Sequence, residues 1–313
     1  MKTAVVTGGA GFIGSHLCDA LIKKGYKVIC VDNLITGSKK NIRHLEKNKN
    51  FKFLKHDVIK DLNLNFDLDY IFHLASPASP FDFQELAEEI ALINSVGTIN
   101  MLELARKTGA RFLLGSTSEV YGDPKEHPQK ETYYGNVNSF GPRSCYDESK
   151  RFGETMTYIY LRKHKVDARV VRIFNTDGPR MRKDDGRAVS NFVNQALDGK
   201  PLTVHGKGNQ TRSFCYYSDM VEGLMKAMFT KGIKGEVINL GNPEEYKILD
   251  LAKKVKKMTG SKSKIVFKPL PKDDPMQRRP NITKAKKLLG WSPKVPLTQG
   301  LKKTIEFYRS AKK

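Results

Sequence analysis

The sequence predicts an α/β fold in which a doubly wound parallel sheet carries a smaller mixed lobe. Over the first 175 residues, short β-branched or aromatic runs alternate with amphipathic helical stretches, which is the pattern of a parallel sheet. A glycine-rich turn joins the first expected strand to the first expected helix. Beyond residue 175 the alternation becomes irregular, which predicts a second lobe over the carboxyl edge of the sheet.

The elements of the first part follow from residue type and spacing. Each expected strand is a short apolar run that ends in small or polar residues. Each expected helix repeats apolar residues at helical spacing, and Gly25 is a suitable residue to end the first one. The strands are expected over residues 2–8, 26–33, 51–58, 68–76, 111–118 and 168–175, and the helices over 12–25, 82–107 and 146–164.

The second part is expected to be less regular. Its sequence contains a polar loop, an isolated strand and several amphipathic helices, without any internal repeat. The loop is expected at 178–187, the strand at 201–206, the helices at 188–199, 218–229 and 247–258, and Trp291 lies in a C-terminal apolar segment.

The chain of 313 residues carries a formal charge of +22. Such a charge is compatible with nucleic-acid binding. The lysines, however, are spread along the chain without the interleaved aromatic residues of a nucleic-acid groove. We therefore favour a basic solvated surface, part of which attracts an anionic substrate, and do not expect a nucleic-acid partner.

Other classes of protein are disfavoured by the same composition. No apolar run approaches the roughly 20 residues of a membrane helix. Met1 is followed almost at once by the first strand, which leaves no room for a signal peptide. Cys18, Cys30, Cys145 and Cys215 are scattered, which predicts reduced thiols in a cytoplasmic protein, without disulfides or a metal site.

The glycine-rich turn has the spacing of a dinucleotide-binding loop. Gly9, Gly11 and Gly14 form a GxGxxG pattern, preceded by Gly8, between a strand and a helix. Glycines there let the backbone approach a pyrophosphate at the helix N-terminus, which predicts a Rossmann-type fold. Asp32 ends the second strand, where a carboxylate accepts ribose hydroxyls and repels a 2′-phosphate. The sequence therefore predicts NAD, not NADP, as the cofactor.

Tyr146 and Lys150 are four residues apart on an expected helix, so their side chains share one face. Such pairs also occur on protein surfaces without any function. Beside NAD, a lysine ammonium and the positive nicotinamide would favour the phenolate, so that Tyr146 could act as a general base. Thr117, at the end of a preceding strand, is expected to be its hydroxyl partner.

The sequence contains several longer motifs, VTGGAGFIGSHL, HLAS, STSEVYGDP, YDESK, RIFNTDGPR and GNQTRSF. Together they resemble the motifs of extended short-chain dehydrogenases/reductases that modify nucleotide sugars, the NAD-dependent epimerase/dehydratase family. The blocks HLASPASP, YYGNVNSFGPRSCYDESKRFGET and DDPMQRRPNITKAKKLLGW are similar to those of the UDP-glucuronate decarboxylase (UDP-xylose synthase) branch. The resemblance extends nearly from end to end of the chain.

The resemblance implies a mechanism. In the family, NAD+ takes a hydride from sugar C4 while the tyrosine takes the hydroxyl proton. The C5 carboxylate is then β to a ketone, so carbon dioxide can leave. Reprotonation at C5 and return of the hydride give UDP-xylose and restore NAD+. The cofactor supplies the redox chemistry and the protein positions the substrate.

The resemblance also implies roles for individual residues. The expected catalytic residues are Thr117, Glu119, Tyr146, Lys150 and Arg278. The expected NAD contacts are Gly8, Gly11, Phe12, Ile13, Gly14, Asp32, Asn33, Thr36, Gly37, Asp57, Val58, Leu74, Ser76, Tyr146 and Lys150. The expected substrate contacts are Ser118, Asn175, Arg180, Arg212 and Arg278, with Arg279 as an alternative to Arg278.

Four positions bear on the choice among related activities. The 4,6-dehydratases carry an Asp-Glu pair where this chain has Ser118 and Glu119, and serine is a poor acid, so dehydration is disfavoured. Asp177 stands where the decarboxylases usually have an aromatic residue, and His205 where they often have tyrosine. These departures leave the NAD chemistry intact but put the details of substrate binding in doubt.

Two alternatives remain. One is a UDP-sugar 4-epimerase, which releases no carbon dioxide. The other is a non-catalytic NAD-binding protein whose positive surface binds RNA or acidic partners.

The resemblance also implies a division into two domains. The NAD domain is expected to contain residues 1–174 and 213–242, and the nucleotide-sugar domain residues 175–212 and 243–313. It further implies a homodimer formed through the 82–107 and 145–164 helices.

Overall fold

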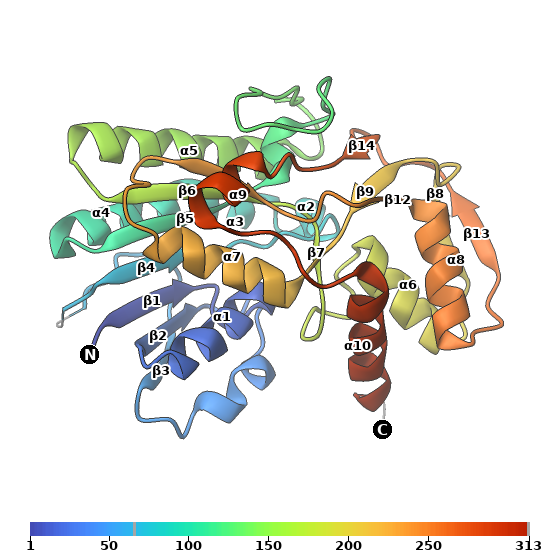
Figure 1. Ribbon diagram of the computed structural model, residues 1–313, viewed down its shortest axis with the longest axis horizontal. Helices are drawn as coiled ribbons and strands as arrows, with labels where there is room; N and C mark the ends of the chain where they lie inside the picture. Colours follow the sequence, from blue (N-terminus) through green and yellow to red (C-terminus); the bar gives the residue numbers. More distant parts are fainter. Residues whose placement is uncertain (65–66, 312–313) are drawn as a thin grey trace.

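The computed structural model describes residues 1–64 and 67–311, so the last two residues of the expected second domain lie outside it. Its centre is a seven-stranded sheet in the order β11-β6-β5-β4-β1-β2-β3 (Figure 1). All neighbouring strands run parallel, which confirms the predicted doubly wound sheet. The strands are β1 Thr3–Thr7, β2 Lys27–Asp32, β3 Phe51–Lys55, β4 Tyr70–His73, β5 Arg111–Thr117, β6 Ala168–Ile173 and β11 Val237–Leu240.

Both faces of this sheet are covered by helices. Consecutive strand residues point to opposite faces, and Val5 and Val6 accordingly belong to different apolar cores. One core lies under α1 (Phe12–Lys23) and α7 (Tyr217–Phe229), and the other under α4 (Thr98–Thr108) and α5 (Ser144–Lys163). Burial on both faces explains why the strands are almost continuously apolar in sequence.

The helix expected over residues 82–107 is not continuous. It consists of α2 (Asp82–Glu85), α3 (Ala87–Leu92), a π-helical turn (Ile93–Gly97) and α4. A Cβ added to Gly97 would lie 2.7 Å from Val58 Cγ2, so the π turn ends where the helix passes close to the β3–β4 connection. Apolar periodicity predicted the length of this segment but not the change in its winding.

The smaller lobe has its own apolar core, to which α6, α8 and α10 contribute Phe192, Leu251 and Leu301. Two small sheets complete it, β8 with β13, and β12, β9 and β14. In Figure 1 this lobe lies to the right of the sheet domain. Its elements are α6 Ala188–Leu197, β8 Leu202–His205, β9 Thr211–Ser213, β12 Glu245–Lys247, α8 Ile248–Thr259, β13 Ile265–Lys268, β14 Gln277–Arg278 and α10 Leu297–Ser310.

The chain crosses between the lobes more than once. β7 (Thr176–Asp177) follows β6 of the large sheet, and β10 (Cys215–Tyr216) precedes α7. These two short strands pair in parallel. α9 (Thr283–Leu289), which the expected boundaries put in the second domain, packs against α7 and β11. Trp291 follows α9 and donates from Nε1 to the Asp219 carbonyl of α7, 2.9 Å away. The C-terminal region therefore contributes to the core of the sheet domain before it returns to the smaller lobe.

The remaining short elements are 3-10 turns, at Lys39–Asn41, Arg43–Leu45 and Ser118–Tyr121. Within residues 1–64 and 67–311, no helix is long and apolar enough to cross a membrane.

Candidate active site

A cavity of about 470 Å³ lies at the carboxyl ends of the parallel strands, between the sheet and the smaller lobe. β2 and β3 lie on one side of β1, whereas the next strand in the sequence, β4, lies on the other side. The direction in which strands are added to the sheet therefore reverses beside β1. Ligands of open parallel sheets bind at such reversal points. The cavity is lined by every site residue expected from the sequence except Arg278.

The glycine-rich loop lines one end of the cavity. Gly8 has φ +68° and donates to the Val31 carbonyl at 2.8 Å. A Cβ on Gly8 would lie 2.9 Å from the Ala75 backbone, and one on Gly14 would lie 2.1 Å from the Gly8 carbonyl oxygen. The tight turn thus needs glycine at both positions, and it leaves the N-terminus of α1 open for a pyrophosphate. These residues fit a bound dinucleotide.

Asp32 lies at the edge of this loop. Its carboxylate accepts from the Ala10 and Leu34 amides at 2.9 and 2.8 Å. Burial raises the pKa of Asp32, while these backbone bonds oppose that rise. A Cβ on Gly37 would lie 2.7 Å from Asp32 Oδ1, so the following loop also passes close to this carboxylate. The loop geometry therefore holds a carboxylate where an adenosine ribose is expected.

Tyr146 and Lys150 lie on one face of α5, next to the end of β5. The Lys150 ammonium is 5.9 Å from the centre of the Tyr146 ring and donates to the Gly115 carbonyl at 2.9 Å. Tyr146 stacks on Phe83, with ring centres 5.1 Å apart, and is hydrogen-bonded to the side chain of Thr117. Both members of the pair are buried, so they are not a surface pair.

The protein's own groups do not make Tyr146 acidic, contrary to the simple expectation from the Tyr-Lys pair. Burial raises the pKa of Tyr146 to about 12, against the opposing effect of its hydrogen bond with Thr117. Burial also lowers the pKa of Lys150 to about 7. Both shifts disfavour the charged forms because the pair lies away from water. A lysine that bonds to a carbonyl and readily loses its charge contributes little to ionising the phenol.

Glu119 is held among arginines at the other end of the cavity. Removal from water would raise its pKa, but Arg278, Arg143 and Arg212 together lower the pKa of Glu119 to about 2. Arg143 donates to one of its oxygens, and Arg278 Nη1 lies 3.4 Å from the other. Glu119 is therefore ionised at neutral pH and can accept hydrogen bonds, but it cannot act as an acid.

Arg278 is placed differently from the other expected contacts. It is only 1% exposed and lies behind Glu119, away from the cavity lining. It donates to the Ser118 carbonyl and, at 2.7 Å, to the Gly122 carbonyl. This geometry allows Arg278 to position Glu119 and the 118–122 turn, and its contact with substrate stays a prediction.

Sequence reasoning missed Arg143. Its guanidinium bonds to Glu119, lies 5.3 Å from the centre of the Phe83 ring, and faces Asp147 and Asp274 at 3.7 and 3.9 Å. Arg143 lines the cavity beside Arg212. The available signal was its place three residues before Tyr146, which is about one helical turn.

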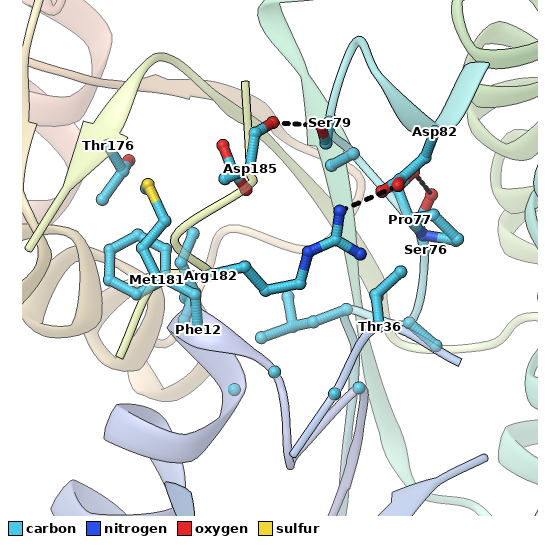
Figure 2. Close-up of a pocket in the computed structure, with 18 of the residues that line it drawn as sticks. Phe12, Thr36, Ser76, Pro77, Ser79, Asp82, Thr176, Met181, Arg182 and Asp185 are labelled. Atoms are coloured by element: carbon cyan, nitrogen blue, oxygen red, sulfur yellow. Dashed lines mark hydrogen bonds and ion pairs between the residues drawn. The ribbon is translucent and has the colours of Figure 1, made fainter. Parts of the chain in front are cut away.

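The 179–187 loop of the smaller lobe also reaches across the cavity (Figure 2). Arg182 points toward the sheet domain and pairs with Asp82 at 2.8 Å, while the Ser79 hydroxyl donates to the Asp185 carbonyl. Arg180, expected to contact substrate, lines the cavity but pairs with Asp19 of α1 at 2.8 Å. The two lobes are thus tied together by polar contacts over the dinucleotide end.

The two departures from the family motifs lie outside the cavity lining. His205 ends β8 and bonds through Nδ1 to the Pro269 carbonyl at 3.0 Å. Asp177 is 3% exposed, and its Oδ2 has no hydrogen-bond partner in the described part of the chain. A Cβ added to Gly300 of α10 would lie 3.6 Å from that oxygen. Burial raises the pKa of Asp177 to about 7. We therefore expect Asp177 to affect the stability of the folded protein and not to contact the substrate.

Within residues 1–64 and 67–311, no group of three or more His, Cys, Asp or Glu side chains is arranged to hold a metal ion.

Comparison with known proteins agrees with this geometry. A family profile described as GDP-mannose 4,6 dehydratase matches residues 5–304. The chain is 53% identical to UDP-glucuronic acid decarboxylase 1 of Danio rerio, over 98% of this chain and 72% of that protein. It is 55% identical to UDP-glucuronic acid decarboxylase 4 of Arabidopsis thaliana, over 97% and 68%.

A solved structure shows the same fold. The UDP-glucuronic acid 4-epimerase of Bacillus cereus, in complex with UDP-glucuronic acid and NAD, superposes with a TM-score of 0.89. It is 33% identical and covers 99% of both chains. The chain therefore belongs to the extended short-chain dehydrogenase/reductase family described by the GDP-mannose 4,6 dehydratase profile, and within it resembles the UDP-glucuronic acid decarboxylases.

Proposed function

We propose that this chain is an NAD-dependent decarboxylase that converts UDP-glucuronate to UDP-xylose. The observation that carries the proposal is the joint placement, in one cavity, of a dinucleotide loop, the Tyr146–Thr117 pair and Glu119 among arginines. Identity above 50% to two UDP-glucuronic acid decarboxylases supports it, against 33% to a UDP-glucuronic acid 4-epimerase.

The cofactor would be held by the glycine loop, Asp32 and the α1 N-terminus. NAD+ bound there supplies a hydride acceptor for the sugar C4 carbon and a positive charge beside Tyr146. With that charge present, Tyr146 would form the phenolate more readily than in its protein surroundings alone and could take the C4 hydroxyl proton. Thr117 fixes the phenol through its hydrogen bond.

The loss of carbon dioxide makes smaller demands on the protein. Once C4 is a ketone, the bond from C5 to the carboxylate breaks and its electrons move toward the C4 oxygen. Tyr146 then carries the proton, and its buried hydroxyl, with a pKa of about 12, can donate a hydrogen bond to that oxygen. Protonation of the resulting enolate at C5, return of the hydride to C4 and return of the proton from Tyr146 to the C4 oxygen then give the xylose product. Glu119 cannot protonate a leaving hydroxyl because its pKa is about 2, which disfavours 4,6-dehydration. Its role is to accept a sugar hydroxyl and to hold Arg143.

Product analysis tests this proposal. Incubation of the purified protein with UDP-glucuronate and NAD+, followed by proton NMR, should show UDP-xylose. A new UDP-hexuronate with the carboxylate retained would instead identify a 4-epimerase. Salt-sensitive binding to RNA with no conversion of any nucleotide sugar would favour the non-catalytic alternative.

Cofactor preference should depend on Asp32. We expect Asp32→Asn to weaken NAD+ binding about 10-fold, because a ribose-accepting carboxylate is lost. The preference for NAD+ over NADP+ should narrow as well, because the charge that repels a 2′-phosphate is gone. Titration of both cofactors against both proteins, followed by protein fluorescence, measures this. An unchanged ratio of the two affinities would contradict the placement of Asp32 at the ribose.

We also infer a homodimer through α3, the π turn and α5, which pack side by side. These segments carry exposed apolar side chains, at Leu92, Val96, Phe152 and Ile159. Sedimentation should give twice the chain mass of 35.4 kDa, and Phe152→Glu should shift the protein to monomers because a charge would be buried. A wild-type monomer at micromolar concentration would contradict the inference.

A cytoplasmic location, expected from the sequence, is compatible with four free cysteines.

A further inference from the structure

The chain between β13 and β14, residues 269–276, crosses the substrate end of the cavity without helix or strand. Asn138 Nδ2 donates to Asp273 at 3.0 Å, and the Met276 amide donates to Asp123 at 3.0 Å. Leu270 and Met276 are exposed, and Asp273 has φ +62°. Pro275 is buried and the Met276 carbonyl accepts from the Thr211 amide at 3.0 Å, so the segment is fixed at its β14 end, whereas residues 269–274 are attached mainly by polar contacts.

Asp274, in this segment, lies between two arginines of the cavity. Its Oδ2 accepts from Arg212 Nη2 at 2.9 Å, and its Oδ1 lies 3.9 Å from Arg143 Nη1. The other bond of Arg212 goes to the Thr211 carbonyl, which is neutral. All three side chains line the cavity. In the described part of the protein, the Arg212 guanidinium therefore forms its ion pair with Asp274.

A carboxylate and a phosphate use the same guanidinium donors. A diphosphate that enters the cavity therefore competes with Asp274 for Arg212 and Arg143. Glu119 does not compete in this way, because it also contacts buried Arg278. Asp274 is itself half-buried, with a side chain that is 25% exposed, and lies on a connection without helix or strand.

We propose that Asp274 is an internal counter-ion that occupies Arg212 and Arg143 until the diphosphate of the nucleotide sugar displaces it, and that it thereby limits affinity for the substrate. The inference rests on the proposed nucleotide-sugar site. It assigns Asp274 a role in setting specificity for doubly anionic ligands, because a weaker anion cannot displace a carboxylate that is already in place.

Calorimetric titration with UDP tests the proposal. Asp274→Asn should bind UDP about 10-fold more tightly than wild type, because two guanidinium groups are released from a partly exposed ion pair. Uridine, which lacks the diphosphate, should bind both proteins equally. A loss of structure would weaken binding, so tighter binding cannot result from damage.

Asp273→Asn is the matched control. It removes the same charge one residue away, keeps an oxygen that can accept from Asn138, and leaves Arg212 and Arg143 paired. Its affinity for UDP should stay within about 2-fold of wild type. Equal or weaker binding of UDP to Asp274→Asn would overturn the inference, and so would an equal gain in Asp273→Asn. If UDP binds none of the proteins, the proposed function fails as well, so the two failures are distinguishable.

Discussion

Tyr146→Phe is expected to lower the rate of UDP-xylose formation by about 10²- to 10⁴-fold, the usual contribution of a general base. The substitution removes one hydroxyl and leaves the ring stacked on Phe83. The fold should therefore be unchanged, and the loss should appear in kcat. Initial rates by NMR, with a melting curve of each protein, measure the effect.

Tyr158→Phe provides the control on the same helix. Tyr158 also lies on α5, but its side chain is exposed and outside the cavity. Loss of its hydroxyl should leave the rate within about 2-fold of wild type. If Tyr146→Phe kept more than a tenth of the activity, another group would have to accept the C4 proton.

Asp177→Asn should change the pH dependence of stability. The pKa of Asp177 rises from 3.8 to about 7 on burial, so the folded protein binds a proton that the unfolded chain has already lost in this range. Stability therefore falls as pH rises from about 4 to 7 and then stays level, by about 4 kcal/mol for this group. Asp177→Asn has no carboxyl group at this position, so its stability does not fall for this reason. The free energy of unfolding of the variant minus that of wild type should therefore increase by this amount over the interval.

Urea unfolding of both proteins between pH 4.5 and 8.5 measures this difference. Wild type alone is insufficient, because burial also raises the pKa of Asp147 to about 7 and adds a slope of the same sign. Glu46→Gln, at an exposed position, is the control for the loss of a carboxylate. A constant difference for Asp177→Asn would mean that Asp177 is ionised in the folded protein.

The sheet could be predicted because its causes are local. Alternate residues of each strand, such as Val5 and Val6, must both be apolar when helices cover both faces. The glycine loop was predictable for a related reason, since a Cβ at Gly8 or Gly14 would collide with the backbone. The break within residues 82–107 was not predictable from periodicity, because it depends on how Gly97 meets Val58 of another segment.

The sequence predicted which residues form the candidate site, but it did not predict how their pKa values shift. The Tyr146–Lys150 spacing placed both side chains together, but the direction of their pKa shifts follows from burial. Arg278 lies behind Glu119 because two segments distant in sequence pack together there. Asp274 meets Arg212 for the same reason. Contacts of this kind depend on tertiary packing, which a single sequence does not display.

The most direct test of the proposed activity follows the carboxyl carbon. UDP-glucuronate labelled with ¹³C at the carboxylate is incubated with NAD+ and either wild type or Tyr146→Phe. We predict one labelled carbon dioxide for each UDP-xylose formed by wild type, and a release about 10²- to 10⁴-fold slower with the variant. Conversion of the labelled substrate to another uronate, with all of the label retained in the sugar, would contradict the account.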